Sequence, residues 1–255
     1  MKEQAILKLV KSKVPVPDCI FASSEENSEN PAYMVQSWIN GCNLREFLQS
    51  PSSTSQKTKI ALLLGETLAN IHSFKFENHG ILGPELKIIN PFIITPESYI
   101  AYMEQFLFDG PAGKRLSQVQ KEDIWKWIQK YLDLLNHLSQ TPGLVHADFN
   151  PLNILISDEE NELTISGILD WEFAFSGSKL FDLGNLFRYE RDLKNPFIEN
   201  IVSSYLQNGG DLPDNWPTLI RLLDLISICS MLNRENCGPI KDKDLRSLIE
   251  FYLLC

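Results

Sequence analysis

Residues 144–156 read LVHADFNPLNILI, and this stretch decides the fold. It places Asp148 and Asn153 five positions apart on a polar loop, directly before an apolar run that predicts a β-strand. A second apolar run, at residues 163–169, ends at Asp170. If the two runs form one hairpin, Asn153 and Asp170 can reach the same ligand.

These side chains suit phosphoryl transfer, in which a protein mainly orients the nucleophile and holds Mg²⁺ against the phosphates. Asp148 can accept a hydrogen bond from a hydroxyl or amine nucleophile, while Asn153 and Asp170 offer the hard oxygen ligands that Mg²⁺ prefers. The spacing from His146 matches the protein-kinase pattern H-R-D-x-x-x-x-N, except that Ala147 replaces the Arg. The missing Arg argues against a protein kinase that is controlled through its activation loop.

Each of these residues taken alone has a simpler explanation, because Asp and Asn often form turns beside strands. Taken together they favour chemistry, since a chance match to the spacing is on the order of one in a hundred from average residue usage. We expect His146 to brace the turn and Trp171 to lie in the core, and leave Glu172 open between a residue near the metal and an exposed acid. Helix faces or the surface are expected for the remaining candidates, His72, His79, His137, Arg188, Tyr189 and Arg191.

Composition excludes several classes of function. The 255 residues carry a formal net charge of −10, whereas nucleic-acid binding normally needs a basic surface; a cationic substrate would suit this charge. No apolar stretch reaches the length that crosses a bilayer, and the first residues lack the apolar core of a signal peptide. We therefore expect a cytoplasmic protein with no membrane or nucleic-acid partner. The five cysteines form no C-x-x-C pair, which favours reduced thiols, and the oligomeric state is left open.

The pattern of apolar residues changes near Gly41. Residues 1–41 predict a small front part, with a helix over 2–12 and strands over 19–22 and 33–39 that are joined by a polar turn. Residues 42–255 predict a mainly helical body that carries the loop and the hairpin. Its helices are expected over 44–48, 57–72, 96–108 and 121–138, with more helices from residue 181 onward.

Together these motifs resemble the aminoglycoside phosphotransferase and choline kinase-like family, which typically has an H-G-D-x-x-x-x-N loop and a later I-D-W-E. Residues 146–172 fit closely, with Ala147 where Gly is usual. Residues 181–184 (FDLG) resemble the family's following D-L-A/G element, and residues 68–72 (LANIH) resemble its L-A-x-L-H helix. Residues 33–44 resemble the hinge strand that ends in P-G-x-x-L.

The resemblance implies an α+β, protein-kinase-like fold with a truncated small N-terminal lobe (residues 1–41) and a large, mainly helical C-terminal lobe (residues 42–255). It implies an ATP-dependent phosphotransferase that transfers the γ-phosphate to a hydroxyl of a small-molecule substrate, with ATP and Mg²⁺ as cofactors. Asp148 would be the catalytic base, and Asn153 and Asp170 would be the Mg²⁺ ligands.

The nucleotide and the loop would be held by further residues that the resemblance assigns. Asp182 would hold the catalytic loop rather than touch the substrate. The adenine would meet backbone groups of the hinge, with Leu155 under the ring. The hinge residues concerned are Gln36, Ser37, Trp38 and Ile39.

Two parts that a kinase lobe normally uses on the phosphates are missing from the sequence. No glycine precedes Gly41, so no Gly-rich loop is present there, and no strand precedes the first helix to carry the usual Lys. Glu3 is the candidate for the helix Glu that pairs with that Lys, whose own place would lie upstream of Met1. We therefore expect slow or absent turnover.

Three interpretations stay open. The chain is an active phosphotransferase with a late start or a reduced front lobe, or it is a catalytically impaired, kinase-like binding or regulatory protein. A metal-dependent hydrolase is the weakest alternative, because it leaves the hinge-like segment unexplained.

Overall fold

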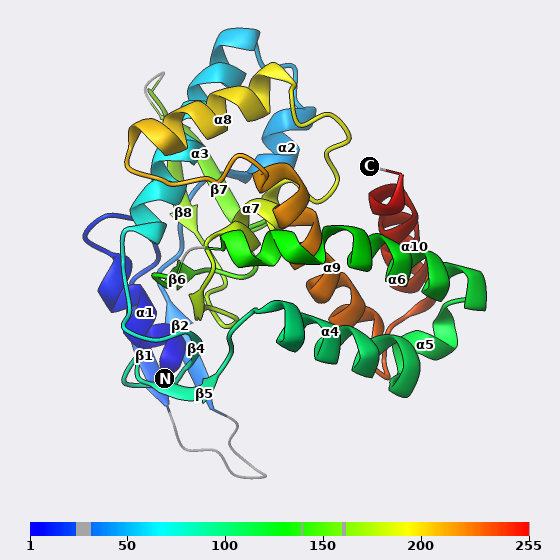
Figure 1. The fold of residues 1–255 in the computed structure, drawn as a ribbon. Helices are drawn as coiled ribbons and strands as arrows, with labels where there is room; N and C mark the ends of the chain where they lie inside the picture. The colour runs from blue at the N-terminus through cyan, green and yellow to red at the C-terminus, as the bar shows by residue number, and fades with distance from the viewer. Residues whose placement is uncertain (24–31, 139, 160–161, 255) are drawn as a thin grey trace. The chain divides into compact units, whose positions relative to one another are not determined.

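The computed structural model describes residues 1–23, 32–138, 140–159 and 162–254 (Figure 1). Residues 24–31, which form most of the polar turn expected between the first two strands, lie outside the described part. The chain divides into two compact units. The first comprises Met1–Phe92, Gln140–Leu186 and Asp192–Leu212, and the second comprises Ile93–Ser139, Phe187–Arg191 and Pro213–Cys255. The division into lobes at residue 41 stays a prediction.

The first unit opens with the helix and the two strands that the sequence predicts. Helix α1 (Lys2–Val10) buries Ile6, Leu7 and Val10, which form one apolar stripe. Strands β1 (Cys19–Ser23) and β2 (Tyr33–Gln36) pair antiparallel. The second strand is shorter than the expected span of residues 33–39.

The predicted hairpin is present and carries the candidate metal ligands at its open end. Strand β7 (Ile154–Glu159) pairs antiparallel with β8 (Glu162–Ile168), and the short strand β3 (Cys42–Asn43) adds to the other edge of β7. Ile154 faces Ile168 in this register. The residues just beyond this pair are therefore neighbours across the hairpin.

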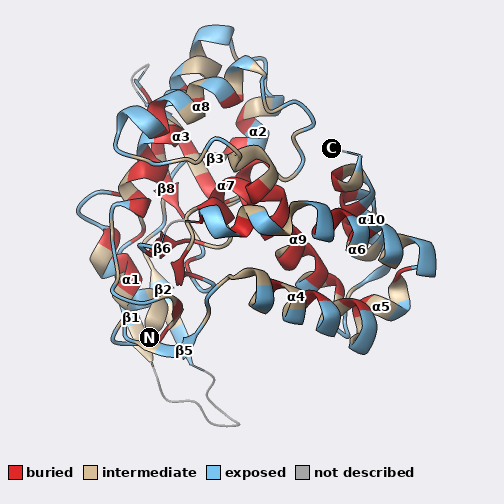
Figure 2. Cartoon of the chain, in the orientation of Figure 1, coloured by how far each residue is buried: buried red, intermediate tan, exposed pale blue. Residues whose placement is uncertain are grey.

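Helices α2 (Leu44–Gln49) and α3 (Thr54–His72) pack against this sheet, and α8 (Pro196–Gln207) packs against α3. Helix α7 (Leu180–Leu186) belongs to the same unit. A capping box between Ser53 and Gln56 begins α3, and its expected apolar face is buried along the helix (Figure 2). Gly65 lets α8 approach closely, because a Cβ at this position would lie 2.3 Å from the carbonyl oxygen of Ile201.

A four-stranded sheet in the first unit was not predicted from the sequence. Its order is β5-β4-β9-β6. The strands are β4 (Gly80–Leu82), β5 (Ile88–Pro91), β6 (Gly143–Val145) and β9 (Phe175–Gly177). Strand β6 leads directly into the loop of His146 and Asp148, so this sheet anchors one side of the candidate site.

The second unit is helical. It contains α4 (Pro96–Glu104), a π-helical turn (Gln105–Asp109), α5 (Pro111–Arg115), α6 (Gln118–Tyr131), a 3-10 turn (Leu132–His137), α9 (Trp216–Leu232) and α10 (Pro239–Leu253). The expectation that Arg188 lies on a helix surface is wrong. Its guanidinium is largely buried and contacts both carboxylate oxygens of Asp224, which also accepts a hydrogen bond from Tyr252 at 2.7 Å.

No helix within the described ranges is long and apolar enough to cross a membrane. The cysteines whose side chains are described are all free thiols, as the sequence predicts: Cys19, Cys42, Cys229 and Cys237.

Candidate active site

The Asp148 carboxylate is oriented by two asparagine side chains of its own loop. Nδ2 of Asn150 donates to Oδ1 and Nδ2 of Asn153 donates to Oδ2, each at 2.8 Å. Nδ2 of Asn153 also donates to the backbone oxygen of Asp148 at 3.0 Å. Because the nitrogen of the Asn153 amide faces Asp148, its oxygen is presented away from that carboxylate. The sequence analysis assigned no role to Asn150, which has the same function as Asn153 in holding the carboxylate.

Asn153 and Asp170 flank the open end of the hairpin, as predicted. The N–H of Leu169 donates to the backbone oxygen of Asn153 at 2.9 Å, which fixes the two chain segments against each other. Asp170 itself is exposed and has a φ of 63°, an uncommon value for a residue other than glycine. Within the described part of the chain, no donor forms a hydrogen bond to its carboxylate.

The donor set fits Mg²⁺ better than a metal that needs a full protein cage. Among residues 1–23, 32–138, 140–159 and 162–254, no group of three or more His, Cys, Asp or Glu side chains could hold a metal ion. Two carboxylates and an amide oxygen remain at the site, on Asp148, Asp170 and Asn153. Mg²⁺ typically takes one or two carboxylates and completes its shell with water and substrate phosphates. The residues present are therefore compatible with a phosphate-bound Mg²⁺.

The buried Asp182 holds the backbone of the catalytic loop, in agreement with its expected role. Its Oδ2 accepts from the N–H of His146 and its Oδ1 accepts from the N–H of Ala147, each at 2.8 Å. A third donor, Nε2 of His72, lies 3.1 Å from Oδ2. The sequence analysis missed this last contact, because His72 was expected on a helix face or at the surface and is 2% exposed.

The His146 ring braces the loop from the other side. Nδ1 accepts from the N–H of Asp148 at 3.2 Å, and Nε2 donates to the carbonyl of Leu169 at 3.0 Å. One imidazole thus ties the base-bearing loop to the strand that leads into Asp170. Burial lowers the pKa of His146, and this outweighs the opposing effect of Asp182 and the other nearby carboxylates. The ring is therefore a neutral brace, as the sequence analysis expected.

Glu3 lies next to the end of the hairpin that carries the candidate metal ligands. Its Oε1 accepts from the backbone N–H of Trp171 at 3.4 Å and from Nε2 of Gln36 at 3.3 Å. Burial raises the pKa of Glu3, and the negative charges of Asp170 and Glu172 raise it further, although the two hydrogen bonds act in the opposite direction. Along the described chain, no lysine or arginine forms an ion pair with Glu3. Among the described residues, the partners of this carboxylate are therefore an amide and a backbone N–H and not a cation.

The hinge residues differ in what they can offer a nucleotide. The N–H of Ser37 already donates to the backbone carbonyl of Asp18 at 2.8 Å. The N–H of Asp18 in turn donates to Oγ of Ser37. Within the described chain, the backbone groups of Trp38 and Ile39 form no hydrogen bond to another main-chain group. The Trp38 side chain is 90% exposed. The backbone at Trp38 and Ile39 is thus the part of the hinge that is available to a ligand.

Leu155 and the hinge meet on one face of the hairpin. Leu155 is paired directly with Gly167, so a side chain at either position points to the same face. A Cβ at Gly167 would lie 2.8 Å from Cδ1 of Ile39, which shows that Ile39 covers this face. The predicted positions of Ile39 beside the nucleotide and Leu155 beneath it are therefore compatible with each other.

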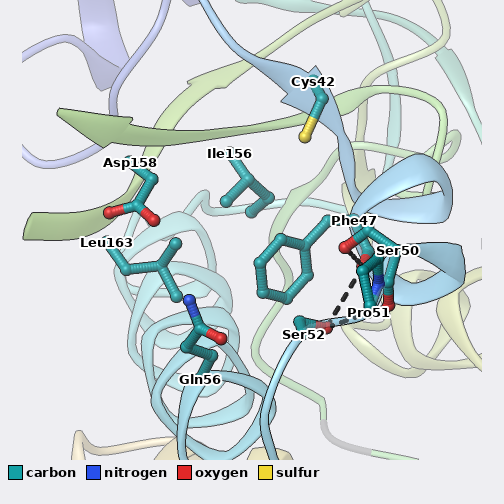
Figure 3. A pocket seen from close by; sticks show the side chains of 9 residues that line it. All are labelled: Cys42, Phe47, Ser50, Pro51, Ser52, Gln56, Ile156, Asp158 and Leu163. Carbon is teal, nitrogen blue, oxygen red and sulfur yellow. Dashed lines mark hydrogen bonds between the residues drawn. The ribbon is translucent and has the colours of Figure 1, made fainter. Parts of the chain in front are cut away.

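A cavity of about 250 Å³ lies on the opposite face of the same hairpin (Figure 3). Ile156 lines it, and Ile156 alternates with Leu155 along β7. Phe47 and Gln56, from α2 and α3, line it as well. None of Asp148, Asn153 and Asp170 borders this cavity, so it is separate from the candidate active site.

The sequence as a whole matches a family that fits this site. Residues 1–219 match the model of the phosphotransferase enzyme family, and the chain belongs to this family. It has a protein-kinase-like fold, and solved structures of aminoglycoside phosphotransferases have the same fold. The GDP complex of wild-type aminoglycoside 2'-phosphotransferase-IIIa matches with a TM-score of 0.74 and 17% identity, over 99% of this chain and 81% of that chain.

Two further relatives show how widely the similarity extends. A thermostable mutant of aminoglycoside phosphotransferase APH(4)-Ia, in a ternary complex with AMP-PNP and hygromycin B, matches with a TM-score of 0.71 and 15% identity, over 99% of this chain and 81% of that chain. Acyl-CoA dehydrogenase family member 11 from Pongo abelii is 25% identical over 232 residues, which are 82% of this chain and 27% of that protein. The chain thus spans about a quarter of the length of the curated relatives that it matches.

Proposed function

We propose that this protein is an ATP-dependent phosphotransferase that transfers the γ-phosphate to a hydroxyl of a small-molecule substrate. The observation that carries the proposal is the Asp148 carboxylate, which Asn150 and Asn153 hold in place, while Asn153 and the exposed Asp170 flank the open end of one hairpin. One similar structure, of aminoglycoside 2'-phosphotransferase-IIIa, contains GDP, and another, of APH(4)-Ia, contains AMP-PNP and hygromycin B. These complexes support a nucleotide and a small molecule as the two substrates.

Each residue would act through position and charge. Asp148 accepts the hydrogen bond of the substrate hydroxyl and takes its proton as the new bond to the γ-phosphorus forms, while the bond from that phosphorus to the β–γ bridging oxygen breaks and ADP leaves. The oxygen of Asn153 and the carboxylate of Asp170 would hold Mg²⁺, which when bound neutralises phosphate charge. Backbone groups at Trp38 and Ile39 bind the base of the nucleotide, and Leu155 supports its ring.

A second candidate, a kinase-like binding or regulatory protein, is favoured by one observation. Glu3 accepts hydrogen bonds from Gln36 and Trp171 where an active kinase lobe has a Lys–Glu pair on the phosphates. Without that cation the transition-state charge is less well stabilised, so we expect turnover to be slow in this chain.

The test separates nucleotide binding from turnover. We expect ATP to bind in a Mg²⁺-dependent way by calorimetry, and Asp170→Asn to abolish this dependence. Asp148→Asn should keep the binding but lower the rate of ATP turnover by about 100-fold or more, because it removes the proton acceptor. Asp158→Asn, which changes an exposed acid further along β7, is the matched control.

Three results are informative. Binding with turnover that depends on Asp148 supports the phosphotransferase. Binding that depends on Mg²⁺ and Asp170, without turnover, supports the binding protein. Mg²⁺-independent binding, or none, contradicts both assignments of the metal ligands.

A further inference from the structure

We infer that His72 and Tyr205 are positioning residues of this active site, which act on Asp148 through Asp182. The inference rests on the proposed function, because it assigns these two residues to the same phosphotransfer reaction. Neither touches the expected substrate site. Their effect passes through a chain of buried hydrogen bonds in the first unit.

The direction of each hydrogen bond in this series is fixed by the carboxylate at its end. An ionised carboxylate only accepts, so Nε2 of His72 carries the proton and donates it to Oδ2 of Asp182 at 3.1 Å. In a neutral ring Nδ1 then has a lone pair, and it accepts from the hydroxyl of Tyr205 at 2.9 Å.

Burial keeps His72 in this neutral form. The ring is 2% exposed, and burial lowers the pKa of His72 although the neighbouring Asp182 opposes the shift. The tautomer is then set from both sides, by Asp182 at Nε2 and by Tyr205 at Nδ1. The Tyr205 ring also packs edge-on against the imidazole, with centroids 5.5 Å apart.

Two helices are packed closely enough to keep this contact rigid. A Cβ at Gly65 of α3 would meet the oxygen of Ile201 at 2.3 Å and the backbone nitrogen of Tyr205 at 2.7 Å. Oγ of Ser204 donates to the carbonyl of Leu62 at 2.6 Å. His72 and Tyr205 therefore meet on two helices whose backbones are in direct contact.

Asp182 connects these two helices to the loop that carries Asp148, because its carboxylate contacts both His72 and that loop. Oδ2 accepts from both His72 and the N–H of His146, while Oδ1 accepts from the N–H of Ala147. If the His72 donor is lost, the carboxylate keeps only its two bonds to the loop and is no longer tied to α3, so both N–H groups directly before Asp148 have a less firmly placed acceptor. Misplacing a base by about 1 Å can lower a rate by about 100-fold. The hinge and Asn153 are held by other contacts, so nucleotide affinity should change little.

Four variants test the inference. His72→Leu removes the donor to Asp182, His72→Gln keeps an N–H at the place of Nε2, and Tyr205→Phe removes the hydroxyl that donates to Nδ1. Tyr99→Phe is the matched control, because the hydroxyl of Tyr99 is also buried and donates to a carbonyl, that of Leu222, within the second unit.

We expect kcat for ATP turnover to fall by about 10- to 100-fold in His72→Leu, as when a supporting partner of an active-site residue is removed. Tyr205→Phe should give a smaller fall, and His72→Gln should restore most of the rate. The affinity for Mg²⁺-ATP should stay within about threefold, and Tyr99→Phe should leave both quantities unchanged while lowering the melting temperature. A ¹H–¹⁵N spectrum of the wild-type imidazoles should show His72 with its proton on Nε2.

The outcomes separate this inference from the proposed function. If wild-type protein turns over and His72→Leu keeps the rate, or if His72 carries its proton on Nδ1, the positioning role is wrong while the phosphotransferase stands. If His72→Leu does not fold, the comparison of Tyr205→Phe with Tyr99→Phe decides the same question. If the wild type binds no Mg²⁺-ATP and shows no turnover, the proposed function is wrong, and the positioning role of His72 and Tyr205 is then wrong as well.

Discussion

Ala147 is the residue at which the catalytic loop departs from the family pattern, and the structure shows the physical consequence. Its φ is 68°, in the left-handed region where a Cβ approaches the following carbonyl oxygen. In this conformation the Ala147 N–H donates to Oδ1 of Asp182 at 2.8 Å. A residue with a Cβ is thus held in a strained conformation directly before Asp148.

We predict that Ala147→Gly stabilises the protein by about 1 kcal/mol, because glycine adopts this conformation without the strain. The free energy of unfolding in urea checks it. The control is the same substitution at Ala101, an exposed residue within α4, which should destabilise by about 1 kcal/mol because glycine weakens a helix interior. A loss of stability in both variants would contradict the argument from strain.

Local spacing was enough to predict which candidate residues lie together at the hairpin, but not the residues that hold their loop in place. Asp148, Asn153 and Asp170 follow from a short loop and one hairpin, whose geometry is set by nearest neighbours along the chain. The role of His72 depends on Asp182, which is 110 positions away, and on a helix that supplies Tyr205. No pattern within a single segment contains that information, apart from the resemblance of residues 68–72 to a family motif that ends in His.

Among the helices and strands, the long elements could be predicted from the sequence and the short strands could not. The hairpin β7–β8 and helix α3 were predicted because each is long enough to show a period of buried residues. Strands β4, β6 and β9 have three residues each, which is too few for alternation to show. They exist because segments far apart in the sequence pair with one another. Ser176 pairs with Gly80, which is 96 positions away, and with Leu144, which is 32 positions away.

The contact between α3 and α8 gives a prediction at this scale. Gly65→Ala should destabilise the protein by about 2 kcal/mol or more, because the added methyl group meets backbone atoms of α8 that cannot move without shifting the helix. It should also lower kcat, since the same shift moves Tyr205. Glu66→Ala, at the next and exposed position of α3, should change stability by less than about 0.5 kcal/mol. Equal melting temperatures for the two variants would show that the helices do not pack as described.

For the whole molecule, buried histidines link stability to pH. His72 and His146 are both buried and neutral, and burial lowers the pKa of each from its ordinary value of 6.5. In the unfolded chain each ring binds a proton as the pH falls through about 6.5, whereas the folded protein binds it only at lower pH. The unfolded state therefore holds more protons in this window, and acid favours unfolding.

We predict that the free energy of unfolding is highest above pH 6.5 and falls as the pH decreases towards 5. Each buried histidine contributes a slope of up to about 1.4 kcal/mol per pH unit, so the two together give up to about 2.7. In His72→Gln one of the two titrating groups is absent, and the slope between pH 5 and 6.5 should be about halved. Urea unfolding at pH 5, 6, 7 and 8 measures it, with His137→Gln, at an exposed position, as the control that keeps the wild-type slope. Carboxylates that titrate in the same range are common to all three proteins and cancel in the comparison, so an unchanged slope in His72→Gln would mean that His72 is not held neutral by the fold.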